Sequence, residues 1–476
     1  MRAYLSIALL CALLVGANAR PQKSPADPRG IYIYSSDVAT ISADYAQVLT
    51  ESLTVPGVNG IVLVIGWNAI EPSIGQFEWT TLDQWMSQAI SAGLKVNLTI
   101  VAGSDTPSWL FQPAPDGAGA VPLAFSISPH SGATGICDQE TIAAPWDPAF
   151  LGQWDSMLAA LAAHLKSMNT YDAVTLLRLT GINRTTDELR LPAETPESTG
   201  LPCVSNAISI WLQAQYRPSL LLQGWDSITT SFQKSFPDKL FSVAIIPQNP
   251  FPRIDENGMI IQGQVPDENL PLLMLASQKF PGKLVVQFNF LMPGEPASPA
   301  VVGYAQTLGT LAAFQTNNYF GSTGQGAACS EPVTDPTPCT DQTYIEMLQT
   351  GIYPLGQSNS LRAQYIEIFP ANANAFPDDV QQAHLELDPD KLAVKSATQK
   401  KSGKLKVVAT STDQSATLSV TATPAAQGQQ PIDLGAMTKI GSTNQFTLTR
   451  KGLPPISSVE ITSTAGGSVT AQVNQP

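Results

Sequence analysis

The chain has 476 residues, a formal net charge of −13 at pH 7 and 43% hydrophobic residues. A chain of this length and apolar content can bury more than one core, so we expect more than one globular domain. The acidic balance argues against nucleic acid and anionic membrane surfaces as partners.

The first 19 residues have the composition of a secretory signal peptide. One basic residue, Arg2, precedes an apolar run over residues 5–15, and small residues lead to Ala19. The run is too short for a membrane-spanning helix, which needs about 20 apolar residues. We therefore expect cleavage after Ala19, a secreted or periplasmic location, no membrane span in the mature chain, and a mature charge of −14.

Residues 28–388 alternate between short apolar segments rich in β-branched residues and longer amphipathic stretches. Strands that are buried on both faces and separated by helices form a parallel sheet, and eight such units close into a barrel. A doubly wound open sheet is the structural alternative, but no Gly-rich phosphate loop follows the first strand. The sequence thus predicts a (β/α)8 (TIM) barrel over 28–388, with intervening helices that include a single long one over 207–235. Its eight strands are predicted at 30–36, 60–67, 95–103, 173–181, 240–248, 283–290, 310–317 and 363–370.

The loops of this barrel differ in length between its two ends. Long stretches rich in Pro, Gly and Ser follow the third, fourth, fifth and seventh strands, whereas connections from helices back into strands are short. Barrel enzymes build their sites from the loops at the carboxyl ends of the strands. We therefore expect a binding site at that end.

Four cysteines remain after signal removal, and all lie in the long loops: Cys137, Cys203, Cys329 and Cys339. An even number in an exported chain favours two disulfides. Cys329 and Cys339 are close together in the stretch GQGAACSEPVTDPTPC, which favours a local bridge and leaves Cys137 to pair with Cys203. A zinc site is the competing interpretation, but the chain has no CxxC and only three histidines, so we expect no metal and no cofactor.

From about Lys391 onward the composition changes, with more Lys, Ser, Thr and Gln and no helical periodicity. Short alternating runs such as LKVVAT, ATLSVTAT and SVEITST follow one another, separated by turn residues. These features predict a small all-β sandwich over residues 393–476, with a linker near 387–395.

Residues 67–83 read WNAIEPSIGQFEWTTLD. This segment resembles the second barrel unit of retaining glycoside hydrolases of the β-galactosidase and cellulase clan, many of which carry W-x-x-x-E-P-x-x-G-x-F/Y-x-W/F-x-x-L-D there. The physical content of the motif is a turn with packed aromatics, so we favour a structural role for Glu71. Trp67, at the end of its strand, offers an aromatic face either for stacking on a sugar or for packing.

The resemblance implies an acid/base Glu directly after an Asn at the end of the fourth strand, and a nucleophile Glu at the end of the seventh. Here Arg184 follows Asn183, and Gln315 stands near the nucleophile position. A Gln cannot act as a nucleophile or a general base. The available acids are Glu188 in the fourth loop and Glu367 on the following strand. Either the strand count is off by one and Glu367 is the nucleophile, or the barrel has lost or moved the usual pair.

Glu367 lies between Ile366 and Ile368 in an apolar run. By strand alternation it faces opposite to both neighbours, and a charge in such a run is costly unless it is paired or functional. It therefore either lines the barrel mouth or is a buried structural carboxylate bonded to Arg362 or to backbone amides.

We therefore expect an exported O-glycoside hydrolase or hydrolase-like protein acting on oligo- or polysaccharide, with Glu188 as proton donor and Glu367 as second carboxylate. The alternative is a non-catalytic carbohydrate-binding barrel, which Arg184 and Gln315 favour. A third interpretation, a cell-surface scaffold protein, rests on the C-terminal sandwich. Polar and aromatic residues near the strand ends are the candidates for sugar binding: Trp67, Asn183, Gln287, Asn289, Gln315, Asn317 and Tyr319.

Overall fold

The computed structural model describes residues 28–475 apart from several short gaps. The gaps are residues 129–136, 185, 249, 264, 295, 318–340, 357–360, 389, 413–415, 427–428, 442 and 464–466. The predicted signal peptide, the predicted Cys329–Cys339 bridge and Tyr319 lie outside the described residues.

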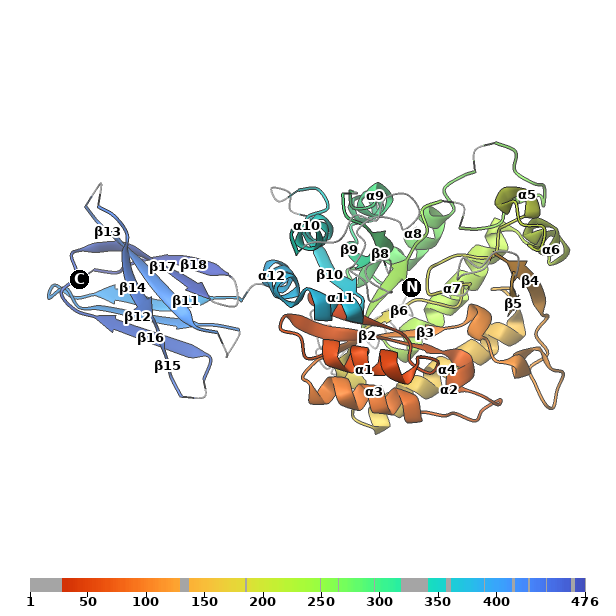
Figure 1. The fold of residues 1–476 in the computed structure, drawn as a ribbon, viewed down its shortest axis with the longest axis horizontal. Coiled ribbons are helices and arrows are strands. Elements are labelled where there is room, and N and C mark those ends of the chain that lie inside the picture. The colour runs from red at the N-terminus through yellow and green to blue at the C-terminus, as the bar shows by residue number, and fades with distance from the viewer. Residues whose placement is uncertain are drawn as a thin grey trace, which may run out of the picture.

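Eight parallel strands close into a barrel, which confirms the predicted TIM-barrel architecture (Figure 1). Around the ring their order is β1-β10-β9-β8-β7-β6-β3-β2, so each strand of the barrel pairs with the barrel strands before and after it in the chain. Glu367 lies on β10, the eighth barrel strand, and Gln315 on β9, the seventh, so the strand count is not off by one. The strands are β1 (Gly30–Asp37), β2 (Val58–Gly66), β3 (Lys95–Val101), β6 (Val174–Arg178), β7 (Leu240–Ala244), β8 (Leu284–Leu291), β9 (Leu311–Thr316) and β10 (Ala363–Ile368).

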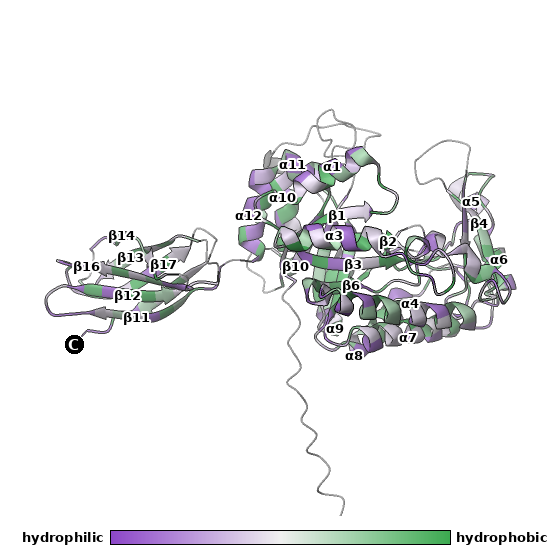
Figure 2. Ribbon diagram, turned by 90° about the horizontal axis from the view of Figure 1, so that it is seen from below, coloured by the Kyte–Doolittle hydropathy of each residue, from purple (hydrophilic) through white to green (hydrophobic). Residues whose placement is uncertain are grey.

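Helices surround the strands, and none in the described part of the chain is long and apolar enough to cross a membrane. Hydrophobic residues follow the central strands, while hydrophilic ones are frequent on the helices (Figure 2). The longer helices of the barrel are α1 (Ala43–Ser52), α3 (Thr80–Ser91), α4 (Pro148–Ser167), α7 (Pro218–Ser235), α8 (Asn269–Lys279), α9 (Pro299–Leu308), α10 (Asp341–Ile352) and α12 (Pro377–Leu387). The shorter ones are α2 (Trp67–Ile70), α5 (Pro196–Thr199), α6 (Ala207–Gln213) and α11 (Pro370–Ala375).

The single helix predicted over 207–235 is wrong. Two helices, α6 and α7, occupy this stretch and are separated by a short connection. Gln215 has a positive φ of 58°, and Pro218 occupies the first turn of α7, where its missing N–H costs no helical hydrogen bond. The proline therefore begins a second helix instead of continuing the first.

The third loop, predicted as a long stretch rich in Pro, Gly and Ser, contains a β-hairpin of β4 (Leu123–Ile127) and β5 (Asp138–Ile142). The predicted disulfide between Cys137 and Cys203 is confirmed, with sulfur atoms 2.08 Å apart. Ser126 and Ser205 add two hydrogen bonds of 2.7 and 2.8 Å between hairpin and fourth loop. The hairpin is thus fixed to the fourth loop on the site side of the barrel.

The C-terminal region forms two four-stranded antiparallel sheets, as predicted for a sandwich. Their shared core is separate from that of the barrel and includes Leu405, Val407, Leu418, Val420 and Ile461, all fully buried. We call this unit the C-terminal sandwich. One sheet contains β11 (Ala393–Gln399), β12 (Leu405–Thr410), β16 (Gln445–Arg450) and β15 (Thr438–Lys439). The other contains β14 (Ile432–Ala436), β13 (Leu418–Pro424), β17 (Ile456–Ser463) and β18 (Ser468–Gln472).

Candidate active site

A cavity of about 430 Å³ opens where the carboxyl ends of the barrel strands meet, which is where barrel enzymes build their sites. Four carboxylates reach its wall, accompanied by one arginine, amides and aromatic rings. The lining residues are Tyr34, Ser36, Asp37, Val64, Val101, Asp105, Thr186, Asp187, Glu188, Arg190, Asn289, Phe290, Gln315, Thr316, Asn317 and Phe369. We call this space the mouth cavity.

Beneath the mouth cavity, Arg178 joins two carboxylates. It is the last residue of β6 and only 1% exposed, and its guanidinium contacts both Asp187 and Glu367. Its Nη2 donates to Glu367 Oε1 at 2.5 Å and to Gln287 Oε1 at 2.9 Å. Glu367 is fully buried and does not line the mouth cavity. Its partner is therefore Arg178, and not the Arg362 considered from the sequence.

Two amide side chains connect this buried pair to the mouth cavity. Gln287 Nε2 donates to Glu367 Oε2 and to Asn289 Oδ1, each at 2.8 Å. Asn289 Nδ2 in turn donates to Glu188 Oε1 at 3.1 Å. The carboxylates of Glu188 and Glu367 thus belong to one hydrogen-bond network, but the two amides stand between them.

Glu188 lines the mouth cavity, as do Asn289 and Asp187 of the same network. Thr186 donates its hydroxyl to Glu188 Oε2, and the guanidinium of Arg190 lies 4.0 Å from the same oxygen. Because Glu188 hydrogen-bonds to Asn289 on β8, its carboxylate lies on the β8 side of the ring.

A pair of aspartates that the sequence analysis did not single out lies on the opposite side. Asp37, at the end of β1, accepts from the backbone N–H of Gly66 at 3.4 Å and of Ala39 at 3.0 Å. Asp105, just after β3, packs on the same glycine, since a β-carbon added to Gly66 would lie 3.1 Å from that of Asp105. Gly66 ends β2, which stands opposite β8 in the eight-stranded ring.

Burial, together with a smaller contribution from the neighbouring charge of Asp37, raises the pKa of the Asp105 carboxyl to about 7. The pKa of Asp37 is also raised by burial, against the effect of its two backbone hydrogen bonds. At neutral pH, Asp105 therefore carries a proton for a large part of the time. A carboxylic acid that stays protonated near neutral pH is able to act as a general acid.

The wall formed by β9 contains polar atoms without partners. Within the described part of the chain, Gln315 Oε1 and Thr316 Oγ1 are buried and form no hydrogen bond. Both residues line the mouth cavity, and they are 5% and 0% exposed. Buried polar atoms without partners are costly, so a ligand that bonds to them would gain affinity.

Three of the predicted sugar-binding residues do not line the mouth cavity. Trp67 is fully buried, packs against Trp109 and Trp154, and donates its indole N–H to Glu71 at 2.9 Å. This position corrects the stacking role considered for Trp67 and supports the structural role of Glu71. Asn183 is 2% exposed and forms hydrogen bonds with backbone atoms of Gly181 and Arg184 in its own loop. Gln287 lies deeper, in the Arg178 network, whereas Asn289, Gln315 and Asn317 do line the cavity.

Arg184, at the position where the resemblance implies an acid/base Glu, is part of an ion-pair cluster. Its Nη1 lies 2.7 Å from Glu194, and its Nε lies 3.6 Å from Glu140 on β5. Glu194 Oε2 also accepts from the backbone of Ser128 at 3.0 Å. Arg184 thus joins the hairpin to the fourth loop, together with the disulfide, and does not line the mouth cavity.

In the described part of the chain, no three His, Cys, Asp or Glu side chains are grouped as metal ligands.

The chain folds as a TIM barrel with a cavity at the carboxyl ends of its strands. Residues 42–120 match the family model described as beta-galactosidase, a range that includes the motif at 67–83, so the resemblance to these barrels is confirmed. No curated protein matches the chain.

Solved structures similar to this chain share little sequence identity with it. The catalytic domain of β-amylase from Paenibacillus polymyxa is 14% identical, with 76% of this chain and 98% of that chain covered and a TM-score of 0.47. Endo-glycoceramidase II from a Rhodococcus species is 12% identical, with coverages of 90% and 98% and a TM-score of 0.41. A β-galactosidase from Rahnella sp. R3 is 10% identical, with coverages of 79% and 59% and a TM-score of 0.44.

Proposed function

We propose that this protein is an exported glycoside hydrolase that cleaves oligo- or polysaccharide in the mouth cavity. The observation that carries the proposal is the pair of acidic groups on opposite sides of that cavity, Asp105 beside β2 and Glu188 beside β8. Glycoside hydrolysis needs two carboxyl groups flanking the scissile bond, one protonated and one ionised. Gln315 Oε1 and Thr316 Oγ1, which form no hydrogen bond within the described residues, would bind sugar hydroxyls.

In this proposal Asp105 is the proton donor. Its carboxyl gives a proton to the glycosidic oxygen as the bond from that oxygen to the anomeric carbon breaks, and the leaving sugar departs as a neutral alcohol. Glu188 faces the positive charge that develops at the anomeric carbon. Water then supplies the new hydroxyl group, and a cavity carboxylate takes up the proton of that water.

Glu367 has a different role here from the one assigned to it from the sequence. Because it is buried behind Gln287 and bonded to Arg178, we assign it to positioning. It holds Gln287, which holds Asn289, which orients Glu188. Glu188 keeps its catalytic assignment, but as the second carboxylate instead of the proton donor.

The test compares two substrate series with single variants. Asp105→Asn removes the proton donor, so we expect hydrolysis of sugar–sugar bonds to fall by about 10²–10⁴-fold. Aryl glycosides with acidic phenol leaving groups need less protonation and should lose much less. Glu188→Gln should slow both series, and Asp116→Asn, which changes an exposed acid that does not line the mouth cavity, is the matched control. Equal losses in both series for Asp105→Asn would contradict its role as the acid.

A non-catalytic carbohydrate-binding barrel is the second candidate. Arg184 and Gln315 favour it, because both positions at which the resemblance implies catalytic acids carry residues that cannot serve. This candidate predicts no turnover of any glycoside by the wild type, together with sugar binding that weakens in Gln315→Ala. Turnover that depends on Asp105 and Glu188 would exclude it.

A further inference from the structure

The formal charge of the chain is unevenly divided between its two units. Residues 390–476 carry nine Lys and Arg against four Asp and Glu, a formal charge of +5. The rest of the chain carries 16 against 34, a formal charge of −18. The net acidity therefore conceals a basic C-terminal sandwich, and the two units should respond to a polyanion in opposite ways.

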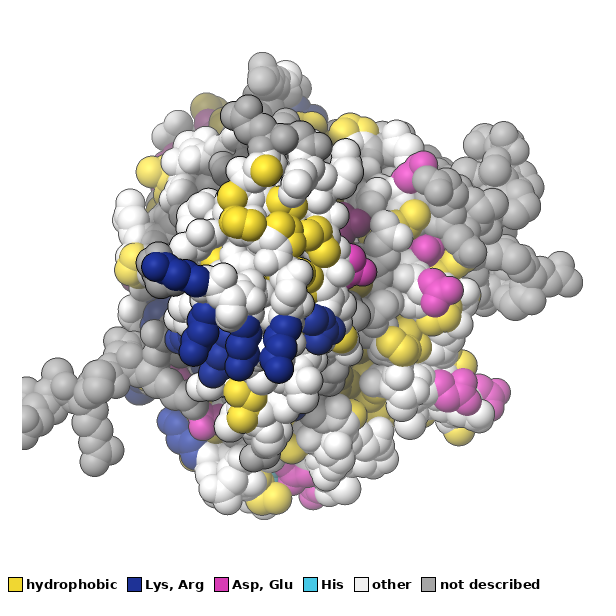
Figure 3. Space-filling model, turned by 90° about the vertical axis from the view of Figure 1, so that its left-hand side faces the viewer, with side chains coloured by type: hydrophobic (Ala, Val, Ile, Leu, Met, Phe, Trp, Pro, Cys, Tyr) yellow, Lys and Arg dark blue, Asp and Glu magenta, His cyan; other side chains and the backbone are white. Residues whose placement is uncertain are grey.

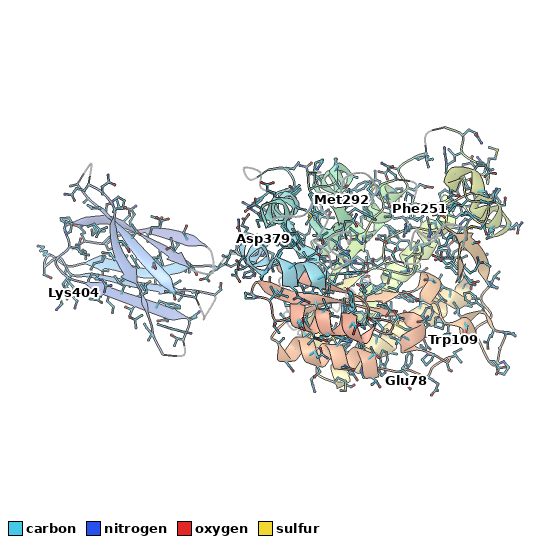
Figure 4. All side chains as sticks on the ribbon, in the orientation of Figure 1. Glu78, Trp109, Phe251, Met292, Asp379 and Lys404 are labelled. Carbon is cyan, nitrogen blue, oxygen red and sulfur yellow. A yellow bond between two sulfur atoms is a disulfide. The ribbon has the colours of Figure 1, made fainter. Side chains whose placement is uncertain are left out.

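Much of this positive charge is gathered at one end of the sandwich. The turn after β11 reads KKSGK and is followed by Lys406, and the turn after β16 begins with Lys451. Neither turn contains an acidic residue. Figure 3 shows a row of basic side chains on the end of the molecule that faces left in Figure 1, and Figure 4 labels Lys404 at the tip of the sandwich. We call Lys400, Lys401, Lys404, Lys406 and Lys451 the lysine tip.

The fold brings the two turns together and keeps them in place. The backbone N–H of Leu453 donates to Gly403 O at 3.1 Å, and Gln399 Nε2 donates to Pro454 O at 2.7 Å. Gly403 has a φ of +74°, and a β-carbon there would lie 2.8 Å from Leu453 O, so this approach requires glycine. These hydrogen bonds hold the backbones of the two turns, and so the lysines that they carry, next to one another.

The lysines of the tip are available to a ligand. Lys400, Lys401, Lys406 and Lys451 are exposed, Lys404 is half-buried, and none of the five forms an ion pair within the described residues. A groove of about 360 Å³ runs between the two turns, lined among others by Lys400, Lys401, Ser402 and Gln475. Two of the five lysines line this groove, and a cluster of five like charges that form no ion pair within the described residues attracts an extended anion.

From these observations we infer that the lysine tip binds an anionic polysaccharide, one with carboxylate or sulfate groups, and holds the protein on it. The choice of a polysaccharide among polyanions rests on the proposed export and carbohydrate function. It is also favoured by what the two turns lack. They contain no aromatic side chain on which nucleic acid bases would stack, and no large exposed hydrophobic side chain for insertion into a membrane.

The anchoring polymer differs from the substrate of the barrel. The mouth cavity carries four carboxylates and belongs to the strongly acidic unit, so a polyanion would be repelled there. Anchoring through the tip would raise the local concentration of neutral glycan segments near the barrel without occupying the mouth cavity.

The experiment measures binding of the full mature chain to polygalacturonate and to chondroitin sulfate, with neutral dextran as the reference. We expect binding to either acidic polymer, none to dextran, and a loss of affinity between about 0.01 M and about 0.15 M ionic strength as the Debye length falls. Lys400→Gln/Lys401→Gln/Lys451→Gln should weaken binding by about tenfold or more. The control Lys166→Gln/Lys234→Gln/Lys283→Gln removes the same charge from the barrel and should leave affinity unchanged.

Three results would overturn the inference: no binding of either acidic polymer at low ionic strength, equal loss in the two triple variants, or tighter binding to duplex DNA or to phosphatidylglycerol vesicles. The readout is binding and needs no turnover, so its failure is distinguishable from failure of the proposed hydrolase. Because the lysine tip lies outside the mouth cavity, the tip variant should hydrolyse small soluble glycosides as the wild type does.

Discussion

The substitution Glu367→Gln probes the buried network beneath the mouth cavity. Glu367 accepts from Arg178 through Oε1 and from Gln287 through Oε2. An amide in its place keeps one oxygen and replaces the other by NH2, so in either orientation a donor faces a donor. Turning Gln287 over to relieve this would break its bonds to Tyr365 at 2.7 Å and to Asn289 at 2.8 Å. The substitution would also remove one of the two carboxylate charges, those of Glu367 and Asp187, that compensate the buried Arg178.

Removing one partner of a buried ion pair typically costs about 3–5 kcal/mol, and we expect Glu367→Gln to fall in this range. The matched variant Glu188→Gln changes a carboxylate at the cavity edge, where water can replace lost contacts, and should cost about 1 kcal/mol. All eight tryptophans lie in the barrel region, so tryptophan fluorescence during urea unfolding reports on that unit. Equal free energies of unfolding for the two variants would refute the reasoning.

Three further predictions concern pH, packing and the disulfide. Burial raises the pKa of Asp105, Glu140 and Glu268 to about 7. At a pH above the ordinary pKa of these carboxyls, the folded state therefore binds more protons than the unfolded state. The free energy of unfolding should therefore fall from about pH 5 to about pH 7.5, by up to about 1.4 kcal/mol per pH unit for each extra proton, and a rise in urea-unfolding experiments would contradict this. Trp67→Ala should cost about 3–5 kcal/mol by circular dichroism, while sugar affinity of the folded variant stays unchanged, because the ring is fully buried among aromatics. Cys137→Ser/Cys203→Ser opens a bridge between residues 66 apart and should increase amide hydrogen exchange in β4 and β5 before the barrel strands are affected; uniform acceleration would argue against this local role.

The barrel could be predicted because each of its strands is a short, locally recognisable apolar run. A parallel strand that is buried on both faces is a short continuous apolar run in the sequence, so the hydrophobic pattern is enough to locate it. The long loops likewise indicated which end of the barrel holds the site. The signal for the split between α6 and α7 is Pro218, because a proline within a helical pattern favours a helix start at that residue.

The contacts of the site could not be predicted in the same way, because they join residues far apart in the chain. Arg178 and Glu367 are 189 residues apart, and the sequence drew attention to the acid but not to its partner. Arg362, the nearer candidate, instead lies over the ring of Tyr353 at 4.1 Å. In the sequence, Asp37 and Asp105 resemble ordinary loop and capping residues, because only the folded barrel brings them close together. The signal that was present is their position, directly at or just after the ends of the first and third strands.

The pH dependence of kcat/KM on a glycoside with a sugar leaving group tests the central claim most directly. If protonated Asp105 is the acid, the rate should fall as pH rises through about 7, the pKa to which burial raises its carboxyl. This falling limb should disappear in Asp105→Asn, because Glu140 and Glu268, the other acids with a pKa raised to about 7, do not line the mouth cavity, and it should remain in the Asp116→Asn control. A wild-type rate that stays level or rises through pH 7, or a falling limb that persists in Asp105→Asn, would contradict the account.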